Sequence, residues 1–235
     1  MPETGRRMGR CTAQAPASHA DLLPRSFYLD PPETVARGLL GKLLVRPADP
    51  AAAGKDCGLA GRIVEVESYH AEADPAAHAF AGKTARNAVL FGAPGHAYIY
   101  FIYGMHYCLN VSCEPEGRAG SVLIRALEPI SGLRRMMELR WPESPVASEI
   151  SPALRLGLTS GPGRLCQAFA ITRARDNGAD FTSPQSSLQI LDDGFSANEI
   201  LVTPRIGIRK AAERPARYLL AGNPYVSGGS RWTAS

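Results

Sequence analysis

Residues 61–69, GRIVEVESY, place two carboxylates and a tyrosine at alternating positions. Side chains of a β-strand point alternately to its two faces, so Ile63, Glu65, Glu67 and Tyr69 are expected on one face and the valines between them on the other. Two interpretations fit this pattern. The acidic face is either the solvated side of a sheet or a pocket wall in which a carboxylate lies beside an aromatic ring.

The following stretch, HAEADPAAHAFAGKTARN, adds a histidine and two basic residues. His78 is either a structural side chain or a catalytic one, and Lys83 and Arg86 either contact phosphates or belong to a solvated loop. Four residues nearby are of metal-ligand type: Glu67, His70, Asp74 and His78. Their spacing matches no recognised metal-binding pattern, so we expect no metal.

Residues 98–110, YIYFIYGMHYCLN, carry a dense group of aromatic rings. A strand over residues 97–102 places Tyr98 and Tyr100 on one face, with Phe101 and Tyr103 on the other. Core packing explains such rings equally well. Since the next residue is a glycine that permits a tight turn, Tyr103 is expected near a hairpin tip, where an aromatic side chain suits insertion between stacked bases.

Polar residues recur on the strands that follow. Asn110 and Ser112 share one face of the return strand, as Leu123 and Arg125 do in VLIRALEP. Inward-facing Asn and Arg are costly to bury without partners, which predicts either an internal polar network or contacts to a ligand.

The elements that position these residues begin with a short helix, in which Asp30 is the expected N-cap, Pro31 opens the first turn and Glu33 is the capping-box acid. A strand over residues 42–46 follows. Further helices are expected over residues 131–139 and after Ser160, a possible cap that precedes Pro162 in the first turn.

Helices do not alternate regularly with strands, which favours an α+β fold: a single mixed domain around a mainly antiparallel curved β-sheet, with flanking helices and a protruding β-hairpin. We expect residues 1–20 to be a disordered tail and residues 21–230 to form the domain.

The composition limits the class of protein. The chain has 235 residues, of which 45% are hydrophobic and 20% charged, and its net charge of +4 permits a polyanionic partner without requiring one. It contains no apolar run of the roughly 18 residues that a membrane span needs and no secretory signal, so a cytoplasmic protein is expected. The odd number of cysteines without a Cys-x-x-Cys pair fits a reducing compartment, with Cys108 and Cys166 as core residues.

Taken in order, RIVEVESY, DPAAH, the RN of TARN, FGAPGHAYIYFIYGMHYCLNV and VLIRALEPI resemble the alkyladenine (3-methyladenine) DNA glycosylase family of base-excision repair. The similarity extends through GLLGKLL, SGPGRLCQAF and IGI, and thus over most of residues 20–227. The resemblance implies a monofunctional glycosylase that flips alkylated or deaminated purines out of duplex DNA, hydrolyses the N-glycosidic bond and leaves an abasic site.

The resemblance also implies roles for individual residues. Glu67 corresponds to the general base that activates the attacking water, and Arg125 to the arginine that helps to hold this water. The family uses no metal and no nicotinamide or flavin cofactor, so no cofactor is expected.

Tyr69, His78 and Tyr100 correspond to side chains that enclose the flipped base. Asn110 corresponds to the pocket residue that excludes guanine, and Tyr103 to the intercalating tyrosine.

Phosphate contacts would come from Lys83, Arg86 and Arg164. The chain departs from the family pattern at His70, at Ala81, where a basic residue is expected, and at Ala85, where proline is common. The expected partner is double-stranded DNA with damaged purines, bound by a monomer that is nucleoid-associated while on DNA and contacts no membrane. Two other readings are a non-catalytic damaged-DNA-binding domain of the same fold and a metal-dependent hydrolase.

Overall fold

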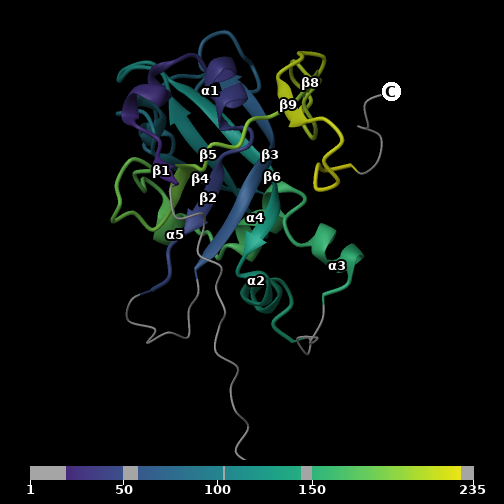
Figure 1. Ribbon diagram of the computed structural model, residues 1–235. Helices are drawn as coiled ribbons and strands as arrows, with labels where there is room; N and C mark the ends of the chain where they lie inside the picture. Colours follow the sequence, from purple (N-terminus) through teal and green to yellow (C-terminus); the bar gives the residue numbers. More distant parts are fainter. Residues whose placement is uncertain (1–19, 50–57, 103, 144–149, 229–235) are drawn as a thin grey trace, which may run out of the picture.

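The computed structural model describes residues 20–49, 58–102, 104–143 and 150–228, and its centre is an open, antiparallel β-sheet with helices around it (Figure 1). The strands are β1 (Asp21–Leu22), β2 (Leu43–Arg46), β3 (Leu59–His70), β4 (Ala97–Ile102), β5 (His106–Cys113), β6 (Gly120–Ser131), β7 (Gln189–Asp192), β8 (Ile200–Thr203) and β9 (Arg217–Leu220). The helices are α1 (Pro32–Leu39), α2 (Leu133–Arg140), α3 (Pro152–Gly157), α4 (Pro162–Ala168) and α5 (Arg173–Asp176), with 3-10 turns η1 (Arg25–Leu29) and η3 (Ala88–Phe91). The α+β prediction is confirmed.

The sheet follows the order β1-β7-β2-β3-β6-β5-β4, and every described pair of strands is antiparallel. It branches at β3, the long central strand. One edge of β3 pairs with β6, while the other edge pairs first with β2 and then, over Glu65–Glu67, with β9. This branching brings β8, β9 and the segments after them beside the acidic part of β3.

The pairing of β3 with β6 is interrupted twice within the acidic segment. Ile63 pairs with Leu127, Glu65 with Ala126 and Val66 with Ile124, so Val64 on one strand and Arg125 on the other are extra residues. Such β-bulges re-aim side chains and are common beside active sites. The two bulges compensate each other, and the register is regular from Val66 to His70, while a further shift lies at the other end, between Ala60 and Gly61.

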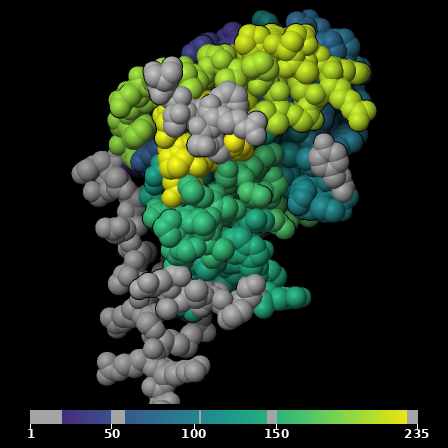
Figure 2. Space-filling model, turned by 90° about the vertical axis from the view of Figure 1, so that its right-hand side faces the viewer, coloured from purple at the N-terminus to yellow at the C-terminus, as the bar shows by residue number. Residues whose placement is uncertain are grey.

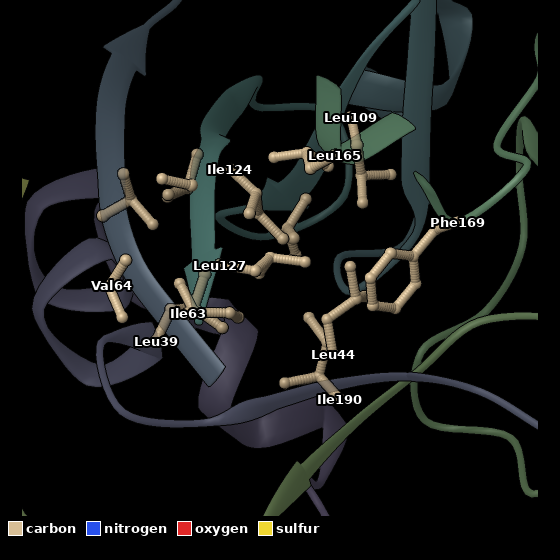
Figure 3. Packing of buried hydrophobic residues seen from close by; sticks show 14 of the residues in the cluster. Leu39, Leu44, Ile63, Val64, Leu109, Ile124, Leu127, Leu165, Phe169 and Ile190 are labelled. Atoms are coloured by element: carbon tan, nitrogen blue, oxygen red, sulfur yellow. The ribbon is translucent and has the colours of Figure 1, made fainter. Parts of the chain in front are cut away.

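The main core fills the space between the sheet and its helices. Figure 3 shows Leu44, Ile63, Leu127, Leu165 and Phe169 packed together with neighbours from α1, β5 and β7. Both faces of β3 are covered, which buries its acidic residues as completely as its valines. The prediction of small core residues is confirmed for Cys108 and Cys166, both of which are buried.

Two predicted helix caps are wrong. Helix α1 has Pro31 at its N-cap and no side-chain cap bond, so Asp30 does not fill that role. Glu33 leaves its own helix terminus and instead contacts His70 and Arg214. A Pro-Pro pair supplies the extended turn and the helical φ angle without a capping oxygen.

Helix α4 likewise has Gly161 at its N-cap, not Ser160. Gly161 has a φ of 125°, a conformation that side-chain-bearing residues rarely adopt, so the turn into α4 depends on glycine.

Strand β4 has the predicted bounds, and the hairpin β4–β5 ends the sheet at one edge. Phe101 and Met105 near its tip are exposed, whereas Tyr98 is buried. Tyr103 lies outside the described residues. The predicted division into residues 1–20 and 21–230 stays a prediction, since residues 1–19 are also outside them.

The chain after β7, drawn in yellow-green and yellow, covers the upper part of the face shown in Figure 2. Within the described parts of the chain, no helix has the length and apolar character that a membrane crossing requires.

Candidate active site

Sheet register assembles one polar row across four strands. Glu67 on β3 pairs with Leu123 on β6, Leu123 pairs with Asn110 on β5, and Asn110 pairs with Tyr98 on β4. Directly opposed residues of an antiparallel sheet point to the same face. The row therefore places Glu67, Asn110 and Tyr98 on one face, where sequence periodicity had predicted pocket-forming side chains.

Glu67 is fully buried and is held by three donors. The Tyr69 hydroxyl donates to its Oε2 at 2.7 Å, and the Ile206 backbone N–H donates to its Oε1 at 2.8 Å. Arg125 Nη1 lies 3.1 Å from the same Oε1. Because a buried charge needs partners, this set stabilises a carboxylate at this point, and the interpretation of a solvated acidic face is wrong.

Arg125 joins Glu67 to the second acid. Its Nε donates to Glu65 Oε1 at 2.8 Å. Glu65 also accepts from Arg217 Nε at 2.7 Å and from the backbone N–H and hydroxyl of Ser227 at 2.6 and 2.8 Å. Burial raises the pKa of Glu65, but Arg125 and Arg217 outweigh it and the net pKa lies below the usual value. Burial lowers the pKa of Arg125, and the two glutamates outweigh that effect and raise it.

A second buried ion pair lies behind Tyr69. Arg205 donates to both carboxylate oxygens of Asp74, with Nη2 to Oδ1 at 2.9 Å, and its guanidinium carbon is 4.5 Å from the Tyr69 ring centroid. Both side chains of the pair are buried. Arg205 directly precedes Ile206, whose N–H binds Glu67, so one ion pair fixes both the ring and the backbone donor.

The aromatic rings of His78, Tyr98 and Tyr100 pack together near Glu67. The centroid of the His78 ring is 4.2 Å from that of Tyr100 and 5.8 Å from that of Tyr98, and His78 Nδ1 is 3.0 Å from the Tyr98 hydroxyl. Burial raises the pKa of the Tyr100 hydroxyl, and the nearby Cys108, Tyr69 and Glu67 raise it further.

Burial, and then the nearby Arg86 charge, lower the pKa of His78. A histidine with a lowered pKa is neutral at pH 7.

The loop that carries His78 is tied down at both ends. Asp74 Oδ1 accepts the Ala76 N–H at 3.1 Å. Asn87, which is buried, donates to the carbonyls of His78 and Gly82 at 3.0 Å each. These bonds fix the backbone on either side of the His78 ring, while residues 80–86 are exposed.

Lys83 and Arg86, which sequence analysis assigned to phosphate contacts, are exposed on this loop. Arg164 is exposed on α4, whose Gly163 packs close to His106 at the start of β5. Lys83 and Arg86 therefore share one loop, and Arg164 lies on a separate segment.

Asn110 and Ser112 are buried and bonded within the protein. Asn110 Nδ2 donates to the Tyr98 carbonyl at 3.2 Å, and the Ser112 hydroxyl accepts the His96 N–H at 3.0 Å. The predicted internal polar network is present, and it leaves the Asn110 side chain on the same row as Glu67.

The four residues of metal-ligand type have separate partners. His70 Nε2 is 2.5 Å from Glu33 Oε1, Asp74 binds Arg205, His78 contacts Tyr98, and Glu67 has the donors described above. Throughout the described ranges, no three His, Cys, Asp or Glu side chains are grouped so as to hold a metal ion.

A small cavity of about 10 Å³ adjoins Tyr69 and His78. Its other lining residues are Ala71, Ala77, Ala79, Leu90, Ala119, Gly120 and Ser121. This volume is roughly that of one water probe, so the cavity is not itself a purine site.

Sequence reasoning predicted Glu67, Tyr69, Tyr100 and Arg125 as neighbours, and the structure places them together. It missed Asp74 as the partner of Arg205, and it missed the Ile206 backbone. The segment IGI was noted for its similarity alone, because nothing in its residue types indicates a backbone donor to a residue on a distant strand.

Comparison with known proteins identifies the family of this chain. Residues 26–224 match the family model described as Methylpurine-DNA glycosylase (MPG). Three relatives carry the name "Putative 3-methyladenine DNA glycosylase". The protein from Koribacter versatilis is 55% identical over 206 residues, covering 88% of this chain and 93% of the relative.

The relative from Methanocella arvoryzae is 47% identical over 209 residues, with 88% and 96% of the two chains covered. The one from Burkholderia lata is 46% identical over 215 residues, covering 91% of this chain and 95% of its own. The match to the family model spans most of the chain, and the chain belongs to the methylpurine-DNA glycosylase family of DNA glycosylases.

Proposed function

We propose that this protein flips alkylated or deaminated purines, 3-methyladenine among them, out of duplex DNA and hydrolyses their N-glycosidic bonds with a water activated by Glu67. The observation that carries the proposal is the position of Glu67: a buried carboxylate, held by Tyr69, Arg125 and Ile206, whose charge acts on Tyr100 in the aromatic cluster of His78, Tyr98 and Tyr100.

The bonds to Glu67 leave one of its acceptor sites for a water. An ionised carboxylate offers about four lone-pair sites, and the donors from the described residues use two on Oε1 and one on Oε2. The remaining site on Oε2 accepts a proton from water. The water oxygen then forms a bond to C1′ of the deoxyribose while the bond from C1′ to the purine nitrogen breaks.

Arg125 and Ile206 supply the other sides of the water site. Arg125 Nη1 is 3.5 Å from the Ile206 carbonyl oxygen, a long contact in which both groups keep capacity for a further partner. A guanidinium N–H donates to a water oxygen, and a carbonyl accepts a water hydrogen. Together with Glu67, these groups orient a lone pair of the water toward the sugar.

The aromatic rings suit the leaving group. Stacking of a base on an aromatic side chain is worth about 1–3 kcal/mol per base, which offsets part of the cost of flipping. A 3-methylated adenine is cationic and is attracted to the ring faces of Tyr69 and Tyr100. The electron pair of the broken bond neutralises this charge, so the base leaves without a proton donor.

A neutral His78 complements this arrangement. When Tyr98 donates to Nδ1, the proton of the imidazole is on Nε2, which is then a donor for the flipped base. Asn110 lies on the same row of the sheet and would exclude guanine by contact with its exocyclic amino group. Tyr103 would fill the gap left in the duplex.

Excision assays test the proposal. DNA treated with a methylating agent, and duplex oligonucleotides with a single hypoxanthine, are incubated with the protein in the presence of a chelator. Free bases are measured by chromatography and abasic sites by alkaline cleavage. We expect release by the wild type and a loss of at least about a hundredfold in Glu67→Gln, because removal of a general base typically costs 10²–10⁴-fold.

Glu128→Gln is the matched control. Glu128 is a partly buried carboxylate on β6 that accepts a bond from Asn223 at 3.1 Å and contacts none of the site residues above. This variant should excise at the wild-type rate. Excision by Glu67→Gln within threefold of Glu128→Gln would refute the role of Glu67, and tight binding of damaged duplex without any excision by the wild type would indicate a binding domain instead.

A further inference from the structure

We infer that Glu65 is a positioning residue for the glycosylase reaction. By binding Arg125 from the side opposite Glu67, it fixes the guanidinium that holds the attacking water. Its negative charge also limits how strongly Arg125 attracts the general base, Glu67. This inference rests on the proposed function.

Geometry is the first support. Arg125 is an extra residue at a β-bulge, so its side chain is not oriented by regular strand pairing. Its Nε binds Glu65 at 2.8 Å and its Nη1 contacts Glu67 at 3.1 Å. Two carboxylates two residues apart on β3 thus grip one planar guanidinium at different nitrogens, which leaves it little freedom to rotate.

The anchoring of Glu65 is the second support. Its carboxylate accepts from Arg217 on β9 and twice from Ser227, near the end of the described chain, as well as from Arg125. Strands β3, β6 and β9 and the segment at Ser227 therefore meet at one buried carboxylate. Such a residue transmits no chemistry itself but sets the position of the group that does.

Charge is the third support. The groups that face Glu67 are Tyr69 and Glu65 on its own strand, Arg125 on β6, Tyr100 on β4, Cys108 on β5, Arg205 before the Ile206 donor, and Arg217, its backbone partner on β9. Among them, only Glu65 adds a negative charge next to Arg125. Removing this charge leaves more of the Arg125 attraction for Glu67.

The test is a pH–rate profile measured in single turnover with saturating enzyme. Methylated DNA is the substrate, because its cationic purines leave without a further proton. The fall in rate at acid pH, called the acid limb below, then reports the general base. For Glu65→Gln we expect the acid limb to move to lower pH, together with a plateau rate reduced at least about tenfold.

Asp176→Asn is the control for general damage to the fold. Asp176 is also a fully buried carboxylate, paired with Arg46 at 2.9 Å and bonded by Ser187, but it contacts none of the groups around Glu67. It should reduce stability and leave the acid limb in place. Ser227→Ala, at a partly exposed site, removes one donor to Glu65 without changing charge, and its acid limb should move slightly toward higher pH.

Three results decide the question. An acid limb for Glu65→Gln that coincides with the wild type overturns the inference while leaving the proposed function intact. If Glu65→Gln does not fold, an acid limb for Ser227→Ala that is unmoved, or moved to lower pH, overturns it as well. Failure of the proposed function is distinct, since it shows as absent excision by the wild type or as full activity of Glu67→Gln.

Discussion

The buried pair of Asp74 and Arg205 allows a stability prediction with a defined magnitude. Asp74 accepts hydrogen bonds from both terminal nitrogens of Arg205 and from the Ala76 N–H. Both charged side chains are excluded from solvent. Asp74→Asn leaves the guanidinium buried against a neutral amide. Breaking a buried ion pair by removing one partner typically costs 3–5 kcal/mol, and since the amide oxygen still accepts the Ala76 N–H, we expect about 3 kcal/mol.

The assay is urea denaturation at pH 7 followed by circular dichroism, which gives the free energy of unfolding. Asp192→Asn is the matched control: Asp192 pairs with Lys42 at 2.6 Å, but its side chain is 39% exposed, and exposed pairs contribute about 0–1 kcal/mol. The reasoning fails if the two variants differ by less than about 1 kcal/mol.

The effect of Asp74→Asn should also depend on pH. Burial raises the pKa of Asp74, but the hydrogen bonds from Arg205 outweigh this and lower it below the usual value. A carboxyl whose pKa is lower in the folded state contributes its full stability above the unfolded value, about 3.9, and loses it as the pH falls through the folded value. The difference between wild type and variant should therefore shrink in acid, whereas an unchanged difference at about pH 2 would contradict the charge argument.

Three further predictions concern DNA binding and thiol chemistry. Lys83→Ala should weaken binding of all duplexes alike and reduce the slope of log affinity against log salt by about 1, as measured by fluorescence anisotropy; an unchanged slope would exclude a phosphate contact. Tyr103→Ala should weaken binding of damaged duplex far more than binding of the free damaged nucleoside in the same titrations, and equal losses would rule out a wedge. Burial raises the pKa of the Cys108 thiol to about 11, so alkylation at pH 8, followed by mass spectrometry, should be at least about a hundredfold slower in the native protein than in urea. Similar rates would show that the thiol is accessible and ionised.

Local residue patterns were sufficient for much of the fold. The strand Ala97–Ile102 and the helix at Leu133–Arg140 follow from alternation and from apolar spacing, because strands and helices with one buried face impose those periods on the sequence. The caps failed for a different reason. Asp30 and Ser160 have the right side chains for capping, but the backbone turns that start α1 and α4 are set by proline and glycine, and Glu33 is drawn to His70 on a distant strand.

For the site, the sequence by itself determined the candidate residues: the acidic and aromatic face of the strand at Glu67, the tyrosines of the hairpin and the arginine of VLIRALEP. Only the tertiary structure decided their partners. The double bulge at Val64 and Arg125, the branch of the sheet at β3, and the return of Arg205 and Ile206 to Glu67 all join segments that are far apart in the chain. Such contacts depend on register and on closure of long loops, and neither is encoded in the spacing of neighbouring residues.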